Sequence, residues 1–412
     1  MAKVNPFNAI RPTAELASKV AALPYDVMNS EEARTMVEGN DISFLRVDKA
    51  EVDLPTDTYI YDGAVYAKAK ENLENLISKG ALVKDDESLY YIYKLTMNGR
   101  SQAGIVACAS VDDYLENKIK KHEFTRADKE KDRIRHVDTL NANTGPIFLA
   151  HRPDATLTEI AAKWMEENDP IYDFEADGDV RHTVYRVADT DVTTQIKEAF
   201  ENIPALYIAD GHHRCASAVK VAQMRRESNP NYTGSEEFNY FLAVIFPSDQ
   251  LHIMDYNRLL KDLNGNDETG LLEEIKKNFE VTAEDGPVRP NARHEFGMYV
   301  EGNWYRIKVH QDFIDESDPV ERLDVSILQR LVLAPVFGIE DPRTDSRIDF
   351  AGGIRGLEYL EKRATSDMKV AFVMYPTAMD ELMDIADAGQ VMPPKSTWFE
   401  PKLLSGFFIH EL

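Results

Sequence analysis

Apolar and polar residues alternate along this chain in short segments, and turn signals separate the segments. Residues 89–97 and 104–111 are rich in apolar residues, and Asn98-Gly99 lies between them. Because Asn-Gly between two such runs favours a two-residue turn, the pattern predicts a β-hairpin. Further strands are predicted at 42–47, 146–150, 180–187, 206–209, 241–246, 251–254, 296–300, 305–309, 369–374 and 403–409. We expect 241–246 to pair with 251–254, and 296–300 to pair with 305–309.

Apolar residues three or four positions apart predict helices between these strands. In residues 61–78 one stripe runs through Val65, Ala69 and Leu73, and Gly80 ends the helix. Asn29 or Ser30 can cap the helix that starts at Glu31. The other helices are predicted at 111–119, 126–140, 157–167, 190–201, 216–226, 271–279, 323–332 and 379–388.

The mixture of hairpins and helices favours an α+β fold over a doubly wound parallel sheet. A chain of 412 residues is too long for one ordinary hydrophobic core. We therefore expect two domains, 1–235 and 236–412, divided after the turn-rich segment 229–234.

Charge and composition remove several classes of function. The chain carries 72 acidic and 47 basic residues, for a net charge of −25, and such a surface repels the phosphates of nucleic acids. Cys108 and Cys215 are far apart in sequence, so neither a disulfide framework nor a cysteine zinc site is expected. No signal peptide and no apolar stretch of membrane-spanning length is present. We expect a soluble, cytoplasmic protein that binds neither nucleic acid nor membrane.

The densest chemistry lies in residues 206–218, where an apolar strand, a turn at Asp210-Gly211 and a helix follow one another. This arrangement directs free backbone N–H groups and the positive end of a helix dipole at an anion. His212, His213 and Arg214 add cations and proton carriers at the turn. A solvated surface turn is the simpler interpretation, but the density of these residues favours a phosphate site near Arg214–Ala216.

Three other polar motifs accompany this loop. Residues 121–125 (Lys-His-Glu-Phe-Thr) precede a charged helix on which Lys129 and Arg133 are four positions apart and share one face. A solvated helix face explains most of its other charges. Residues 24–27 read Pro-Tyr-Asp-Val, and residues 392–397 read Met-Pro-Pro-Lys-Ser-Thr, where flanking prolines restrict the lysine.

These motifs carry a resemblance to known proteins. Gly-His-His-Arg before an alanine-containing helix resembles the signature loop of the ParB/sulfiredoxin-like superfamily. With the other motifs, the chain resembles a bacterial and archaeal family labelled "SpoOJ-like regulator", related to the free serine kinases. The resemblance implies a ParB/sulfiredoxin-like nucleotide-binding core with large insertions, followed by a second mixed α/β domain.

Two relatives differ from this chain at the loop. Sulfiredoxins place a catalytic cysteine directly after the loop glycine, where this chain has His212, so thiol chemistry there is not expected. ParB proteins carry Glu and two Arg after the glycine and a helix-turn-helix domain, for which no basic recognition helix is visible here. The departure leaves open whether His212 or Glu123 acts as the base.

The resemblance implies a kinase that phosphorylates a small hydroxylated amino acid, most simply free L-serine, with Mg²⁺ and either ATP or ADP. A nucleotide-binding regulatory protein without metabolite kinase activity is the alternative. The expected catalytic residues are His122, Glu123, Asp210 and His212. The expected nucleotide-binding residues are Gly211, His213, Arg214, Cys215, Ala216, Lys129, Arg133 and Lys395.

Oxygen ligands suit magnesium, so Glu123 and Asp210 are the expected metal ligands or bases. Tyr25 and Asp26 are expected to hold the ammonium of the amino acid; Glu31 and Glu32 could also do so, or could simply favour the start of a helix. A kinase site needs a phosphate cradle together with a proton acceptor. We therefore expect residues 122–123 and 210–214 to meet, although about ninety residues separate them.

Overall fold

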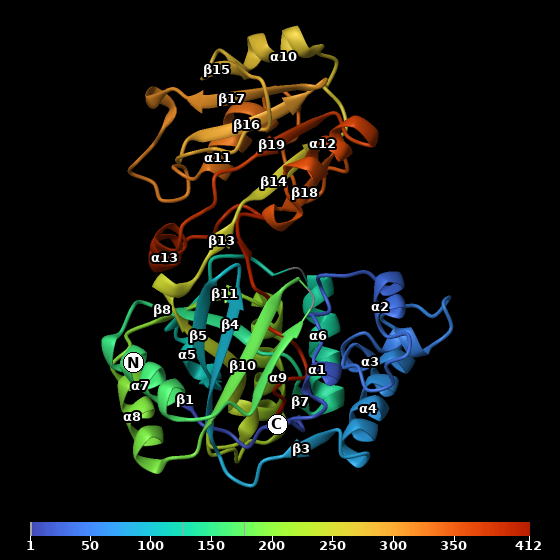
Figure 1. The fold of residues 1–412 in the computed structure, drawn as a ribbon, viewed down its shortest axis with the longest axis vertical. Coiled ribbons are helices and arrows are strands. Elements are labelled where there is room, and N and C mark those ends of the chain that lie inside the picture. The colour runs from blue at the N-terminus through green and yellow to red at the C-terminus, as the bar shows by residue number, and fades with distance from the viewer. Residues whose placement is uncertain (1, 126, 177) are drawn as a thin grey trace. The chain divides into compact units, whose positions relative to one another are not determined.

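The computed structural model describes residues 2–125, 127–176 and 178–412, and its contacts divide the chain into two units (Figure 1). The first unit is Met1–Leu251 with Pro401–Leu412, and the second is His252–Glu400. The expected α+β class is confirmed. The units differ from the predicted division between 235 and 236, because β12 (Tyr240–Pro247) pairs inside the sheet of the first unit.

A mixed sheet forms the centre of the first unit. Within the described residues it has nine strands in the order β6-β11-β8-β12-β5-β4-β10-β9, and β1 pairs with β5 beside this path. The pairs β6/β11 and β8/β12 are parallel, and the other pairs are antiparallel. Its other strands are β1 (Val4–Asn5), β4 (Tyr90–Met97), β5 (Arg100–Ser110), β6 (Ile119–Lys120), β8 (Ile147–His151), β9 (Tyr172–Ala176), β10 (Val180–Val187) and β11 (Leu206–Asp210).

The predicted hairpin is confirmed as β4 and β5, with Met97 opposite Arg100. Asn98 and Gly99 have φ angles of +52° and +75°, both in the left-handed region that this tight turn requires. The sequence favours this turn because Gly has no Cβ atom and Asn tolerates positive φ better than most other residues.

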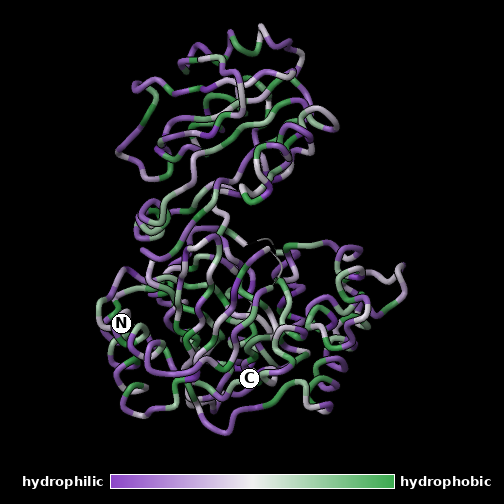
Figure 2. The backbone as a smooth tube through the Cα atoms, in the orientation of Figure 1, coloured by the Kyte–Doolittle hydropathy of each residue, from purple (hydrophilic) through white to green (hydrophobic). Residues whose placement is uncertain are grey.

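Helices cover the sheet, and their apolar faces build the core. The helices of the first unit are α1 (Ala17–Val20), α2 (Ser30–Met36), α3 (Leu45–Asp48), α4 (Gly63–Ser78), α5 (Val111–Leu115), α6 (Ala127–Leu140), α7 (Ala155–Glu167), α8 (Thr190–Glu201) and α9 (His212–Ser228). One cluster joins α7, α8 and α9 to the strands through buried residues such as Phe200, Ile208 and Phe241. Hydrophobic and hydrophilic stretches alternate along the chain, as a two-layer packing requires (Figure 2).

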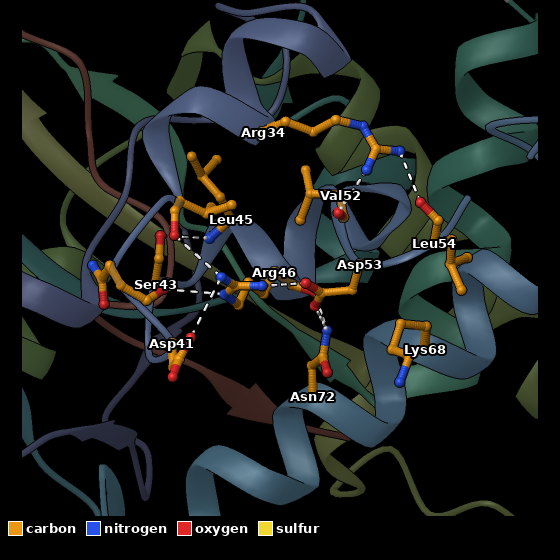
Figure 3. Close-up of polar contacts among 12 residues, drawn as sticks. Arg34, Asp41, Ser43, Leu45, Arg46, Val52, Asp53, Leu54, Lys68 and Asn72 are labelled. Atoms are coloured by element: carbon orange, nitrogen blue, oxygen red, sulfur yellow. Dashed lines mark hydrogen bonds and ion pairs between the residues drawn. The ribbon is translucent and has the colours of Figure 1, made fainter. Parts of the chain in front are cut away.

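A second core lies among α1 to α4, where the predicted strand 42–47 is wrong. Phe44 precedes α3 instead, and two arginines hold the surrounding turns (Figure 3). Arg46 pairs with Asp53 and donates to the carbonyl oxygen of Val37 at 3.1 Å. Arg34 donates to the carbonyl of Val52 at 2.7 Å. The alternating apolar residues of 42–47 therefore lie in a helical turn rather than a strand. Polar bonds from Arg34 and Arg46 to neighbouring segments hold that turn in place.

Three further predictions in this unit need correction. Predicted helix 111–119 ends at Leu115, and residues 119–120 instead form β6. Residues 403–409 are buried without forming a continuous strand; Ser405 and Ile409 make isolated bridges to Ala22 and Ile10. Arg126, where a helix was predicted to begin, lies outside the described residues. Short pairs complete the unit: β2 (Ile10–Pro12) with β3 (Leu82–Lys84), and β7 (Ala142–Asn143) with β21 (His410–Glu411).

The second unit contains an antiparallel sheet in the order β15-β17-β16-β19-β14-β18. Its strands are β14 (Tyr256–Leu260), β15 (Phe279–Glu284), β16 (Glu295–Val300), β17 (Asn303–Val309), β18 (Ile348–Gly352) and β19 (Val370–Val373). Its helices are α10 (Glu268–Ile275), α11 (Asp324–Leu328), which a π-helical turn at Gln329–Leu333 continues, α12 (Leu357–Ser366) and α13 (Met379–Asp387). The predicted hairpin β16/β17 is confirmed.

The predicted pairing of 251–254 with 241–246 is wrong. Residues 253–254 form β13 (Ile253–Met254), which pairs with β20 (Trp398–Phe399). The partner comes from almost 150 residues later, so local spacing could not indicate it. Among the described residues, no helix is long and apolar enough to cross a membrane.

Gly104 on β5 tests the packing of the sheet. A Cβ atom there would lie 2.8 Å from side-chain atoms of Val244 and Phe246. We expect Gly104→Ala to destabilise the protein by about 1–3 kcal/mol through overpacking. The matched control is Gly63→Ala at the first position of α4, where the nearest atom is 3.9 Å away. Urea unfolding followed by circular dichroism measures both, and equal midpoints would contradict this packing.

Both cysteines are buried, and burial raises the pKa of each thiol. Buried thiols behave as small hydrophobic groups with little thiolate. We therefore expect both to react with Ellman's reagent at least roughly 100-fold more slowly in the native protein than in urea. Rapid labelling of one thiol in the native state would show a reactive cysteine and favour a thiol-based activity.

Candidate active site

The centre of the site is the turn between β11 and α9. Gly211 has φ +92° and ψ 29°, a left-handed conformation that an L side chain rarely adopts. Asp210 accepts a hydrogen bond from the N–H of Gly211 at 2.8 Å, and its other oxygen lies 3.1 Å from the ammonium of Lys402. A Cβ at Gly211 would lie 3.1 Å from Nε of Arg214. The guanidinium therefore lies directly against the turn.

The N-terminus of α9 has no side-chain cap. Gly211 provides no side-chain cap, and the N–H groups of a first helical turn have no intrahelical partners. The N–H of Cys215 already donates to the carbonyl of Gly211 at 2.9 Å. The Cys215 side chain is fully buried, and the helical pattern uses the N–H of Ala216 in the same way. The phosphate cradle expected at 214–216 therefore stays a prediction, and the helix start at His212 shifts it to the first turn of α9.

His122 and Glu123 meet this turn, as expected from the sequence. They follow β6, and β6 pairs with β11 in parallel, so both segments leave the sheet at the same edge. Nδ1 of His212 lies 3.8 Å from Oε2 of Glu123. The rings of His122 and His212 pack edge to face with centroids 4.5 Å apart. The predicted convergence is confirmed.

Both of these imidazoles are held neutral. Burial lowers the pKa of His122 to about 4, although Asp210 and the Ile208 carbonyl favour its charged form. Burial and the neighbouring His122 lower the pKa of His212 well below its ordinary value. At this turn, Nδ1 and Nε2 of His122 and Nε2 of His212 are buried and make no hydrogen bond of good geometry. Neutral rings with unpartnered nitrogens are costly to bury unless a ligand satisfies them.

Asp210 behaves in the opposite way. Burial opposes its ionisation, but Lys402 and Arg214 outweigh that effect and hold the pKa of the carboxyl far below its usual range. The site thus combines an ionised carboxylate, two cations and two neutral imidazoles. Lys402 was absent from the sequence-based set. It lies 192 positions after Asp210, and nothing local to Pro401-Lys402 indicates a partner.

A second polar group lies beside the turn, where α6 packs on α9 (Figure 1). Oγ of Ser217 donates to the carbonyl of Glu130 at 3.3 Å and links the two helices. Arg133 on α6 pairs with Asp132 at 2.7 Å, and its guanidinium lies 4.0 Å from the ring centroid of Tyr25. Burial raises the pKa of the Tyr25 phenol, while Arg133 and Arg214 act in the opposite direction. Tyr25, Arg133 and Arg214 are therefore close enough to interact electrostatically.

One end of the Arg214 guanidinium is already hydrogen-bonded within the protein. Its Nη1 donates to the carbonyl of Pro146 at 2.6 Å, and its Nε is buried with no partner in the described residues. Arg133 is already neutralised by Asp132, which reduces its value as a phosphate ligand. Lys129 lies half-buried on the same helix.

The remaining predicted residues fall into two groups. His213 is half-buried at the start of α9, and Asp26 is exposed beside Tyr25 in sequence. Glu32 closes a capping box by accepting from the N–H of Asn29 at 2.8 Å, which supports its simpler role as a helix starter. Lys395 belongs to the second unit, where its Nζ lies 5.5 Å from the ring centroid of Tyr256.

The cluster suits a metal better than the carboxylate pair predicted from the sequence. His122, Glu123 and His212 each offer a ligand atom, and these atoms lie within 4.8 Å of one another. Both oxygens of Asp210 are engaged, one by the N–H of Gly211 and one by Lys402. A carboxylate paired with an ammonium is a poor magnesium ligand, so the structure does not support Asp210 in that role.

Solved structures with some likeness to this chain all share low sequence identity with it. A free serine kinase in complex with AMP is 15% identical, with a TM-score of 0.36, covering 71% of this chain and 86% of that one. SbnI from Staphylococcus aureus, truncated at its C-terminus, is 12% identical, with a TM-score of 0.38, covering 73% and 85%. A conserved hypothetical protein from Pyrococcus furiosus is 15% identical, with a TM-score of 0.34, covering 72% and 92%. TM-scores this low establish neither a common activity nor common site residues.

A search of curated proteins found no match. A family described as "Protein of unknown function (DUF1015)" matches residues 4–326, which is most of the chain. The matched range includes residues 122–123 and the whole of the turn at 210–214. The protein therefore belongs to the DUF1015 family.

Proposed function

We propose that this protein is a nucleotide-dependent phosphotransferase that phosphorylates a small hydroxylated amino acid, with free L-serine as the first candidate. One observation carries the proposal: His122 and Glu123 meet the N-terminus of α9, where Oε2 of Glu123 lies 3.8 Å from Nδ1 of His212. A phosphate cradle and a carboxylate thus stand side by side, which is the minimum that phosphoryl transfer requires. The motifs shared with relatives of the free serine kinases support the same activity.

The phosphate end of the site is the start of α9. The N–H groups of a first helical turn and the helix dipole favour an anion there. Arg214 lies against Gly211 and would place its guanidinium beside the phosphates. Lys402 lies at the same turn but is paired with Asp210 at 3.1 Å, so Arg214 is the cation assigned to the phosphates. A cation beside a helix N-terminus stabilises the charge that spreads over the transferred phosphoryl group.

The acceptor end is Glu123. Its side chain is 40% exposed, so a substrate hydroxyl can reach it, whereas His122 and His212 are buried. A carboxylate within hydrogen-bond reach of the hydroxyl accepts its proton as the oxygen attacks phosphorus. The ring of His212 lies 3.8 Å from Glu123, beyond an ordinary hydrogen bond, and limits where the carboxylate can lie. The proposal thereby assigns the proton acceptor to Glu123 and a positioning role to His212.

The amino-acid ammonium is assigned to Asp26, with Tyr25 beside it. Tyr25 is fixed by the guanidinium of Arg133, which lies 4.0 Å from its ring centroid. Asp26 is exposed, and a carboxylate next to a fixed ring can pair with an ammonium. Lys129 and Lys395 stay as proposed nucleotide contacts with less support than Arg214.

The nucleotide is expected to bring Mg²⁺ with its phosphates, as such nucleotides do in related chemistry. The ion would neutralise phosphate charge. Asp210 is paired with Lys402, so it is not assigned as a ligand of this ion. The work of this chain's own residues is to bind the phosphates, hold the hydroxyl and accept its proton.

The alternative is a regulatory protein that binds a nucleotide and returns it unchanged. Such a protein needs the cradle at α9 but has no use for a carboxylate beside it. The position of Glu123 favours the enzyme. Incubation with serine, Mg²⁺ and either ATP or ADP, followed by mass spectrometry, separates the two: phosphoserine supports the enzyme, and unchanged nucleotide with tight binding supports the regulator.

Two substitutions test the assignment within the active protein. We expect Glu123→Gln to lower kcat at least about 100-fold while leaving nucleotide affinity nearly unchanged, because it removes only the proton acceptor. We expect Arg214→Ala to weaken nucleotide binding about tenfold or more, because it removes a charge-assisted contact. Stopped assays for phosphoserine and calorimetric titration with nucleotide measure the two effects.

Matched controls lie on the same elements. Arg225→Ala changes a basic residue of α9 that pairs with Asp138 at the far end of the helix, and it should leave nucleotide affinity unchanged. Cys215→Ala should leave turnover within a few-fold, since the thiol is buried. Full activity in Glu123→Gln, or a complete loss in Cys215→Ala with the fold intact, would contradict the proposed mechanism.

A further inference from the structure

We propose that His122, Glu123 and His212 form a binding site for a divalent transition-metal ion of the zinc class, distinct from the magnesium that accompanies a nucleotide. Ligand atoms from all three residues lie within 4.8 Å of one another. The two histidines are almost wholly buried, with His122 2% and His212 6% exposed, and Glu123 closes the cluster from the solvent side. Metal binding here does not depend on the kinase activity proposed above.

Hydrogen bonding of the two rings is incomplete. Both nitrogens of His122 and Nε2 of His212 are buried and make no hydrogen bond of good geometry, although the carbonyl of Ile208 lies near His122. Other buried histidines of the same unit have close partners: His182 contacts the hydroxyl of Tyr93 at 2.6 Å, and His410 lies 2.8 Å from Glu237. Because an unsatisfied buried polar atom is costly, two adjacent rings in this state point to a missing ligand.

The orientation of the two rings also suits a shared ligand. The rings pack edge to face rather than stacked, with an interplanar angle of 87°. Two perpendicular imidazoles can direct nitrogens at one point from different sides.

The ligand set selects the metal. Two imidazoles and one carboxylate form a set that zinc and its neighbours in the first transition series bind, and catalytic zinc sites keep a further position open. Magnesium prefers oxygen ligands in octahedral geometry and would leave both imidazoles poorly used. The open position would face the side of Glu123, which is 40% exposed and therefore accessible to a small ligand.

The proposal changes the reading of one residue. As a ligand, Glu123 would hold the metal; as a base, it would accept a proton directly. Both roles predict loss of phosphoryl transfer in Glu123→Gln, but only the metal role predicts loss of bound metal. Metal content therefore tests the site independently of any activity.

The experiment uses the full chain with its affinity tag removed. After treatment with a chelator, the protein is dialysed against Zn²⁺ or Co²⁺ in the presence of millimolar Mg²⁺, and bound metal is measured by mass spectrometry. We expect about one Zn²⁺ per chain, and Co²⁺ should give the visible absorption of a low-symmetry site. His212→Ala and Glu123→Gln should each weaken binding at least tenfold.

The control variant is His410→Ala, which removes a buried histidine that already has a carboxylate partner. It should keep one metal per chain. If His212→Ala does not fold, Glu123→Gln gives the same test at a half-exposed residue. Failure of the wild-type chain to bind Zn²⁺ below about 10 µM, unchanged binding in Glu123→Gln, or displacement by equimolar Mg²⁺ would each overturn the proposal.

Discussion

The carboxylate of Asp210 joins the three parts on which the site depends. One oxygen accepts from the N–H of Gly211, and the other lies 3.1 Å from the ammonium of Lys402. The first contact fixes the left-handed turn that starts α9, and the second fixes the C-terminal segment beside it. The carboxylate is partly exposed, and the loss of either partner would leave its charge less well compensated. The turn, the helix start and the returning chain are therefore coupled through one side chain.

Whether a group at this turn is neutral or ionised depends on the charged groups beside it, and not on burial alone. Asp210 stays charged because two cations face it, whereas His122 and His212 lose their charge because burial outweighs the attraction of Asp210. Glu123 is 3.8 Å from His212, beyond an ordinary hydrogen bond.

Local patterns predicted the elements that local chemistry determines. The turn at Asn98-Gly99, the helix α8 at Thr190–Glu201 and the loop at Gly211 each carry their own capping or turn residues. Strand β13 was missed because its partner β20 comes almost 150 residues later. The helix α3 was missed because the bonds from Arg46 to Asp53 and to the carbonyl of Val37 leave no periodic apolar pattern.

The candidate site shows the same division. Residues 122–123 and 210–214 could be named from motifs, and the parallel pairing of β6 with β11 explains why they meet. Lys402 could not be named, because its importance comes only from its distance to Asp210. Cys215 was assigned to the cradle because the start of α9 was placed too late; once the helix begins at His212, its N–H is already bonded.

The chain order gives Lys402 a further significance. The second unit, His252–Glu400, is inserted between β12 and the segment that carries Lys402. Its two connecting strands, β13 and β20, are hydrogen-bonded to each other, so the chain leaves and re-enters the first unit as a pair. Lys402 lies two residues after that re-entry. The charge balance at Asp210 therefore depends on a residue that directly follows an inserted unit of about 150 residues in the chain.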